Sequence, residues 1–205
     1  MLNGLYALTD ASLTPDDTLL AQVAQALAGG TKIVQLRDKQ RSDAQLLELA
    51  RALQALCRQQ HALFIINDRI ALAKAIAADG VHIGQHDVDF ASARAQLPQQ
   101  IIGVSCYGSL EQARFYQQQG ADYVAFGACF ASSTKPLAPV IDHQLLFQAK
   151  QQLSIPVCAI GGITLDNAPL LVQQGVDMLA VVSDLWTSTN VQLRAQQLSA
   201  LLIKS

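Results

Sequence analysis

The chain has 205 residues, of which 51% are hydrophobic and 15% charged, and its formal net charge at pH 7 is −2. This composition excludes an intrinsically disordered chain, and the near-balance of 14 basic and 16 acidic residues favours neither a nucleic acid nor an anionic membrane as a partner. No apolar run reaches the roughly 18 residues of a membrane-spanning helix, and the first residues show no secretion signal. We therefore expect a single cytoplasmic domain over residues 1–205.

Apolar runs alternate with amphipathic stretches along the whole chain. The runs rich in Val, Ile and Leu predict buried parallel strands. These strands are expected at Leu5–Leu8, Ile33–Arg37, Leu63–Asn67, Gly80–Ile83, Ile101–Ser105, Tyr123–Phe126, Val157–Ile160 and Met178–Val182. The helices between them are expected at Asp16–Ala28, Ser42–Gln60, Ile70–Ala78, Asp89–Leu97, Leu110–Gln119, His143–Gln152, Asp166–Gln174 and Asn190–Ile203. Eight consecutive strand–helix units favour an α/β fold of the (β/α)₈ TIM-barrel type, with an open doubly wound sheet as the alternative.

Three of the predicted helices end at a recurring glycine. Gly30, Gly120 and Gly175 each follow a helix and are separated from the next strand by two residues. Glycine adopts the left-handed conformation at a helix C-terminus at little cost, so these residues are expected to terminate their helices.

Polar residues collect at the carboxyl ends of the predicted strands, where TIM barrels bind their ligands. At the second strand, Gln35, Arg37 and Lys39 alternate with Leu36 and Asp38, and the two-residue period of a strand places the first three on one face. Two cations and an amide inside a barrel mouth require an anionic partner, and a pyrophosphate would supply one. The alternative is a solvated strand end whose cations pair with nearby acids.

Two aspartates follow neighbouring strands, Asp68 after the third and Asp87 after the fourth. Such a pair suits Mg²⁺, which takes one or two protein carboxylates and completes its shell with water and phosphate oxygens. The alternatives are a salt bridge from Asp68 to Arg69 or Arg37, and a helix cap at Asp87, although Asp89 is better placed for that cap.

A second anion site is expected after the last strands. The pairs Gly161-Gly162 and Val182-Ser183 follow the seventh and eighth strands, where barrels often bind phosphate through backbone N–H groups. Ser132, Thr134 and Lys135 follow the sixth strand and supply two hydroxyls and an ammonium to the same mouth. The alternative for this last loop is a flexible surface segment.

The remaining reactive side chains are not needed as catalytic groups. The four cysteines form no C-x-x-C motif and are expected to be buried, reduced thiols. His82 lies on a predicted strand and is interpreted as a core histidine with a satisfied hydrogen bond. With no Ser-His-Asp set, the barrel mouth indicates an enzyme that joins a pyrophosphorylated electrophile to a phosphorylated nucleophile.

Seven motifs, in order over almost the whole chain, resemble those of the thiamine-phosphate synthases. They are VQLRDK (Val34–Lys39), INDR (Ile66–Arg69), GVHIGQHD (Gly80–Asp87), GVS (Gly103–Ser105), SSTKP (Ser132–Pro136), AIGGIT (Ala159–Thr164) and AVVS (Ala180–Ser183). The resemblance implies condensation of 4-amino-2-methyl-5-pyrimidinylmethyl pyrophosphate with a thiazole phosphate. The products would be thiamine phosphate and pyrophosphate, formed by a dissociative mechanism through a pyrimidine carbocation.

The resemblance also implies roles for individual positions. The pyrimidine pyrophosphate would be held by Gln35, Arg37, Lys39, Asn67 and Lys135, with Ser105 facing the pyrimidine. The thiazole phosphate would be held by Ser132, Thr134, Gly161, Gly162, Val182 and Ser183. Asp68 and Asp87 would hold Mg²⁺.

Three departures from the family pattern bear on the thiazole phosphate. Ser132 replaces a usual threonine, Ala128 and Ala131 replace usual prolines, and Asp184 stands where a small residue is usual. An acid at this last position would repel a phosphate unless its charge points away.

Other functions are weighed against the synthase. A thiazole tautomerase shares the barrel, but it would show degraded strand-two and metal positions. It would also have a histidine just after the fifth strand, where this chain has Cys106-Tyr107-Gly108. A non-catalytic barrel that binds thiamine precursors is a further alternative. A sugar-phosphate isomerase would need a positioned base that the sequence does not offer.

Overall fold

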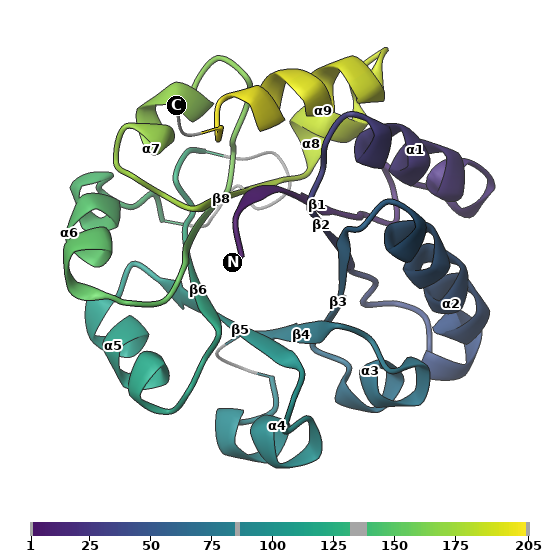
Figure 1. Cartoon of the computed structure of the whole chain (residues 1–205), viewed down its shortest axis with the longest axis horizontal. Helices are drawn as coiled ribbons and strands as arrows, with labels where there is room; N and C mark the ends of the chain where they lie inside the picture. Colours follow the sequence, from purple (N-terminus) through teal and green to yellow (C-terminus); the bar gives the residue numbers. More distant parts are fainter. Residues whose placement is uncertain (1, 85–86, 132–138, 204–205) are drawn as a thin grey trace.

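The chain folds into a closed barrel of eight parallel strands with the helices outside it (Figure 1). The computed structural model describes residues 2–84, 87–131 and 139–203. Each strand pairs with its neighbours in chain order, and β1 closes the barrel against β8 through the pairs Gly4–Met178 to Ala7–Val181. The predicted TIM barrel is confirmed, and the doubly wound sheet is excluded.

The strands and helices have these bounds. The strands are β1 (Gly4–Leu8), β2 (Ile33–Leu36), β3 (Leu63–Asn67), β4 (Gly80–Ile83), β5 (Ile101–Tyr107), β6 (Tyr123–Phe126), β7 (Val157–Ile160) and β8 (Met178–Val181). The helices are α1 (Asp16–Ala28), α2 (Asp43–Gln59), α3 (Ile70–Ile76), α4 (Phe90–Gln96), α5 (Leu110–Gln118), α6 (Gln144–Gln152), α7 (Ala168–Val172), α8 (Ser183–Trp186) and α9 (Val191–Ala200). No helix in the described ranges is long and apolar enough to cross a membrane.

The prediction of eight helices is wrong, because the described residues form nine. The additional helix, α8, has four residues, so it is too short for a helical period to repeat in the sequence. The second strand ends at Leu36, one residue earlier than expected, so Arg37 lies just beyond the sheet. The fifth strand extends to Tyr107 because an irregular pairing between Ser105 and Tyr107 continues it past the expected end.

Each strand divides its side chains between two apolar cores. Along β1, Leu5 and Ala7 face the layer between sheet and helices, whereas Tyr6 and Leu8 face the barrel interior. The interior cluster is the smaller of the two and includes the phenol rings of Tyr6 and Tyr123. Polar atoms therefore lie inside the barrel, where each needs a hydrogen-bond partner.

The amino-terminal end of the barrel is secured by a repeated aspartate. Asp122 and Asp177 each stand directly before a strand, and their carboxylates accept a hydrogen bond of 2.8 Å from a backbone amide of the preceding strand. Asp79, before β4, does the same for β3 at 2.8 Å. Gly120 and Gly175, each separated by two residues from the strand that follows, have φ of +90° and +83°, as predicted for helix-terminating glycines.

Candidate active site

Eight of the predicted site residues line two adjoining cavities at the carboxyl end of the barrel, whereas Lys39, Asp68 and Asp87 line neither. The larger, of about 450 Å³, is lined by Arg37, Ser105, Gly161, Gly162, Val182 and Ser183, among others. The smaller, of about 80 Å³, reaches into the barrel and is lined by Gln35, Arg37, Asn67, His82 and Ser105, among others. Arg37 and Ser105 border both cavities, so residues from β2, β3, β5, β7 and β8 serve one mouth.

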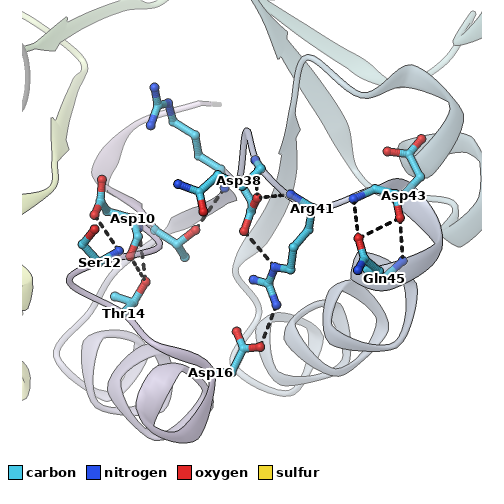
Figure 2. A network of polar contacts seen from close by, with 12 residues as sticks. Asp10, Ser12, Thr14, Asp16, Asp38, Arg41, Asp43 and Gln45 are labelled. Carbon is cyan, nitrogen blue, oxygen red and sulfur yellow. Dashed lines mark hydrogen bonds and ion pairs between the residues drawn. The ribbon is translucent and has the colours of Figure 1, made fainter.

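A network of hydrogen bonds and ion pairs holds the segment after β2, as Figure 2 shows. The Asp38 carboxylate accepts hydrogen bonds from the amides of Gln40 (2.8 Å) and Arg41 (2.9 Å) and from Arg41 Nε (2.8 Å). Burial opposes the charged form, but the two amides and the guanidinium prevail and hold the pKa of Asp38 below its ordinary value. Arg41 in turn pairs with Asp16 of α1 at 2.6 Å. The Asp38 charge is thus compensated within the loop.

Further contacts hold the backbone on either side of Arg37 and Lys39. The Arg37 amide donates to Thr9 Oγ1 at 3.0 Å. Arg69 clamps the same loop from β3, because its Nη2 donates to the carbonyls of Asp38 (2.9 Å) and Arg41 (2.6 Å). This role for Arg69 was not predicted, since the motif places it beside Asp68 and gives no sign of contacts with a loop about thirty residues earlier.

Asp68 has an unusual backbone conformation. Its φ is +49°, in the left-handed region that residues other than glycine rarely adopt. Asn67 Nδ2 donates to Asp68 Oδ2 at 2.6 Å, and the Lys39 ammonium lies 3.4 Å from the same oxygen. The alternative of a salt bridge from Asp68 to Arg69 is wrong, because Arg69 pairs with Asp43 at 2.7 Å. Strain of this kind is typical of functional positions.

Asp87 lies beside the end of β4, where its Oδ2 accepts a hydrogen bond of 2.7 Å from the amide of Gly84. It does not cap α4; Asp89 does, by accepting from the Ser92 amide at 3.1 Å. Asp87 is therefore free of a helix-capping role. Together Asp68 and Asp87 offer carboxylate oxygens, the donor type that Mg²⁺ prefers.

The cavity wall after β7 consists of backbone that carries no side chains at two consecutive positions. Gly161 has φ of +102°, and a Cβ there would meet Ala128 Cα at 2.7 Å. Gly162 has φ of +63°, and a Cβ there would lie 2.4 Å from the carbonyl oxygen of Ala131. Neither position accommodates a side chain, so the peptide backbone itself forms the wall.

The expected repulsion by Asp184 is removed by pairing. Its Oδ1 lies 2.5 Å from Arg194 Nη1 of α9, and its Oδ2 accepts a hydrogen bond of 3.1 Å from the amide of Leu165. The carboxylate is thus neutralised beside Ser183, at the start of α8. Arg194 was not predicted, because only the packing of α9 on α8 brings it to the mouth.

Three predicted site residues, Ser132, Thr134 and Lys135, lie outside the described residues. Of the neighbouring departures, Ala128 and Ala131 are described, and both contact the glycine wall.

The barrel interior contains polar residues that the sequence prediction did not assign to the site. His82 is 9% exposed and hydrogen bonds Tyr123 Oη and Ser105 Oγ, both at 2.8 Å, which confirms it as a core histidine with satisfied hydrogen bonds. Tyr6 and Tyr123 are fully buried beside it. The signal in the sequence was a tyrosine at an inward-facing strand position, where an aliphatic residue is usual.

The four cysteines are free and buried, as expected. Burial raises the pKa of Cys57, Cys106 and Cys129 to about 12. A thiol with so high a pKa is not a nucleophile at neutral pH.

The chain is similar to known proteins over almost its whole length. Residues 5–185 match the family model described as thiamine monophosphate synthase. The thiamine-phosphate synthase of Alcanivorax borkumensis is 50% identical over 203 residues, which cover 97% of this chain and 94% of that protein. The enzyme of the same name from Wolinella succinogenes is 46% identical, covering 94% and 90% of the two chains. The solved structure of a thiamine phosphate pyrophosphorylase from Pyrococcus furiosus superposes with a TM-score of 0.89 at 36% identity, covering 97% of this chain and 95% of that one.

Proposed function

The chain belongs to the thiamine monophosphate synthase family, and from this membership we infer that it is a thiamine-phosphate synthase, a transferase acting on small phosphorylated substrates. We propose that it joins 4-amino-2-methyl-5-pyrimidinylmethyl pyrophosphate to a thiazole phosphate, releasing pyrophosphate. The observation that carries this proposal is the meeting of a cationic wall and a bare-backbone wall in one mouth, each suited to an anion. Arg37 supplies fixed positive charge to one wall, and the side-chain-free backbone at Gly161 and Gly162 forms the other.

The proposed reaction replaces pyrophosphate at the methylene carbon of the pyrimidine. The C–O bond breaks first, its electron pair leaves with the pyrophosphate, and the aminopyrimidine ring delocalises the positive charge. The thiazole nitrogen then forms the new C–N bond with its lone pair. Arg37, Lys39 and Lys135 stabilise the negative charge that develops on the leaving group. No proton is removed from the nucleophile, so the reaction needs no general base.

Mg²⁺ fits the donor set of this site. Asp68 and Asp87 would hold it through carboxylate oxygens, and water and pyrophosphate oxygens would complete the shell. The Lys39 ammonium 3.4 Å from Asp68 supports a position that attracts cations. When bound, the ion would neutralise part of the pyrophosphate charge. Asn67, which donates to Asp68, orients the carboxylate.

The test is formation of thiamine phosphate from the two phosphorylated substrates by the purified full chain, with Mg²⁺ and with a chelator. We expect product with Mg²⁺ and almost none with the chelator. Product that is unchanged by the chelator would refute the metal assignment while keeping the synthase. No product from folded protein, as judged by circular dichroism, would refute the reaction and favour a tautomerase or a barrel that only binds thiamine precursors.

A further inference from the structure

A continuous chain of hydrogen bonds crosses the barrel interior. Gln35 Nε2 on β2 donates to Tyr6 Oη on β1 at 2.5 Å, and Tyr6 Oη lies 2.9 Å from Tyr123 Oη on β6. The next links are Tyr123 Oη to His82 Nδ1 on β4 and His82 Nε2 to Ser105 Oγ on β5, both at 2.8 Å. Five strands therefore contribute one residue each to a single path.

The direction of every hydrogen bond in this path follows from its first donor. A phenol has one proton, so Tyr6, which accepts from the Gln35 amide, donates its own proton to Tyr123. Tyr123 then donates to His82 Nδ1, which leaves the imidazole proton on Nε2. His82 Nε2–H donates to Ser105 Oγ, so the serine hydroxyl keeps its own proton for another partner. Burial raises the pKa of both phenols well above the ordinary value, so both stay protonated.

Both ends of the path open on the smaller cavity. Gln35 is 1% exposed, and its Oε1 has no hydrogen-bond partner among the described residues. A buried carbonyl without a partner is costly and points to a ligand that donates to it. Gln35 and Ser105 both line the cavity, so it offers an acceptor at one end of the path and a donor at the other.

We propose that Tyr6, Tyr123 and His82 are positioning residues that fix this polarity, and that the polarity makes the site specific for an amino-substituted ring over its oxo counterpart. An aminopyrimidine presents an N–H donor beside a ring-nitrogen acceptor, which complements Gln35 Oε1 and the Ser105 hydroxyl. The 4-oxo ring presents a carbonyl acceptor beside a ring N–H donor. Its carbonyl is repelled by Gln35 Oε1, and its ring nitrogen can no longer accept the Ser105 proton. This inference rests on the proposed function, because it specifies how the same site recognises its pyrimidine.

Tyr123 is the informative member of the path, because it lines neither cavity and acts only through its neighbours. Its ring occupies a space that Gly103 leaves open, since a Cβ at Gly103 would lie 1.9 Å from Tyr123 Cζ. The ring also packs edge-on against Tyr6, with centroids 6.1 Å apart. Tyr123→Phe keeps this packing and removes only the hydroxyl that links the two halves of the path.

The first experiment measures binding of the amino pyrimidine pyrophosphate and of its 4-oxo counterpart to the full chain by calorimetry. We expect the wild type to bind the amino form on the order of 100-fold more tightly, because the oxo form loses both hydrogen bonds and places its carbonyl against Gln35 Oε1. In Tyr123→Phe we expect this ratio to fall about 10-fold, the effect of one hydrogen bond. Tyr116→Phe, which removes a phenol on α5 outside both cavities, is the matched control and should keep the wild-type ratio.

A second variant reverses the path without removing a side chain. In Gln35→Glu the carboxylate can only accept, so Tyr6 must donate to it, Tyr123 to Tyr6, and His82 Nδ1–H to Tyr123. We expect nitrogen-15 NMR of histidine-labelled protein to show the Nε2–H tautomer of His82 in the wild type and the Nδ1–H tautomer in Gln35→Glu. The His82 signal is identified by its loss in His82→Asn.

The outcomes separate this inference from the proposed function. A wild type that forms thiamine phosphate, with an unchanged binding ratio in Tyr123→Phe or an unchanged His82 tautomer in Gln35→Glu, overturns the positioning path and leaves the synthase intact. A wild type without synthase activity that still shows the tautomer switch would refute the function and keep the path. If Tyr123→Phe does not fold, the tautomer experiment decides by itself.

Discussion

At the end of the barrel where the strands begin, the carboxylates of Asp122 and Asp177 bind strand amides and pair with Arg94 and Lys150, both at 2.6 Å. At the end where the strands finish, Arg37 borders both cavities and forms no ion pair within the described residues. The same kinds of side chain therefore serve two purposes in one barrel. The compensated charges at the strand starts stabilise the fold, whereas we expect the available charge of Arg37 to bind a ligand.

The contrast extends to the backbone. The glycines near the strand starts, such as Gly120, have a positive φ because a helix ends there, and a Cβ at Gly120 would meet nothing within 4 Å. At the strand finishes, Gly162 has a positive φ in a crowded wall, and Asp68 adopts the left-handed region although it carries a side chain. Gly120 thus uses a positive φ to end a helix in open space, whereas Gly162 uses it within a crowded wall. Residues other than glycine with a positive φ lie at both ends, His61 and Ala77 near strand starts and Asp68 and Tyr107 near strand finishes.

We expect Arg37→Ala to have the largest effect on activity. Loss of the uncompensated cation should lower kcat/KM for thiamine phosphate formation about 10²–10³-fold, because the leaving-group charge loses its stabilisation. Thermal unfolding should be unchanged, since Arg37 forms no ion pair with the described part of the fold. Arg58→Ala, at an exposed arginine on α2, is the matched control. Equal effects of both substitutions would contradict the assignment.

The second-largest effect is expected from Asp68→Asn, which should weaken Mg²⁺ binding. Asparagine tolerates the left-handed backbone, so the substitution removes the charge and spares the conformation. We expect the Mg²⁺ concentration for half-maximal activity to rise about 10–100-fold. Mg²⁺ titrations of the rate provide the measurement, and an unchanged Mg²⁺ requirement would remove Asp68 from the metal site.

Asp177→Asn tests the opposite end of the barrel. It leaves Lys150 without its partner and weakens the bond to the Val157 amide, so the free energy of unfolding should fall by about 2 kcal/mol. Activity per folded molecule should stay at the wild-type level. Chemical denaturation and a parallel assay measure the two effects. Asp17→Asn, on the exposed side of α1, is the control and should change neither.

Arg194→Ala should leave the Asp184 carboxylate uncompensated, so that it repels a phosphate bound nearby. Without Arg194, the Asp184 charge lies unpaired beside Ser183, so the KM for thiazole phosphate should rise about 5–10-fold, an effect of roughly 1 kcal/mol. The double variant with Asp184→Asn should return toward the wild-type KM. A double variant no better than Arg194→Ala would show that the pair acts only on folding.

The smallest effect is expected at the thiols. Because burial raises the pKa of Cys57, Cys106 and Cys129 to about 12, the thiolate is scarce at pH 8 in the folded protein. Iodoacetamide at pH 8 should leave activity intact and label the chain only after unfolding, where the thiol pKa returns to its ordinary value. Rapid labelling of native protein with loss of activity would show that a cysteine belongs to the site.

Much of the barrel could be predicted from the sequence because its signals are local. Strand and helix periods, the glycines before strands and the polar residues after them are all visible within a few positions. Gln35, Arg37, Asn67 and Ser105 were predicted at strand ends, and they line the cavities. The four-residue helix α8 was missed because one turn contains no repeat of the helical period.

Only the tertiary structure decided which charged and polar side chains are paired within the fold and which are available to a ligand. Tyr6 and Tyr123 are 117 residues apart, and the pairing of Asp184 with Arg194 depends on how α9 packs. The sequence determined that the carboxyl end of the barrel would hold cations, carboxylates and bare backbone, because the two-residue period of a strand and the order of the strands fix where each side chain emerges. Closure of the sheet decided the direction of the hydrogen bonds inside the barrel. A donor on one strand determines the role of a residue on another strand only when the two strands meet in space.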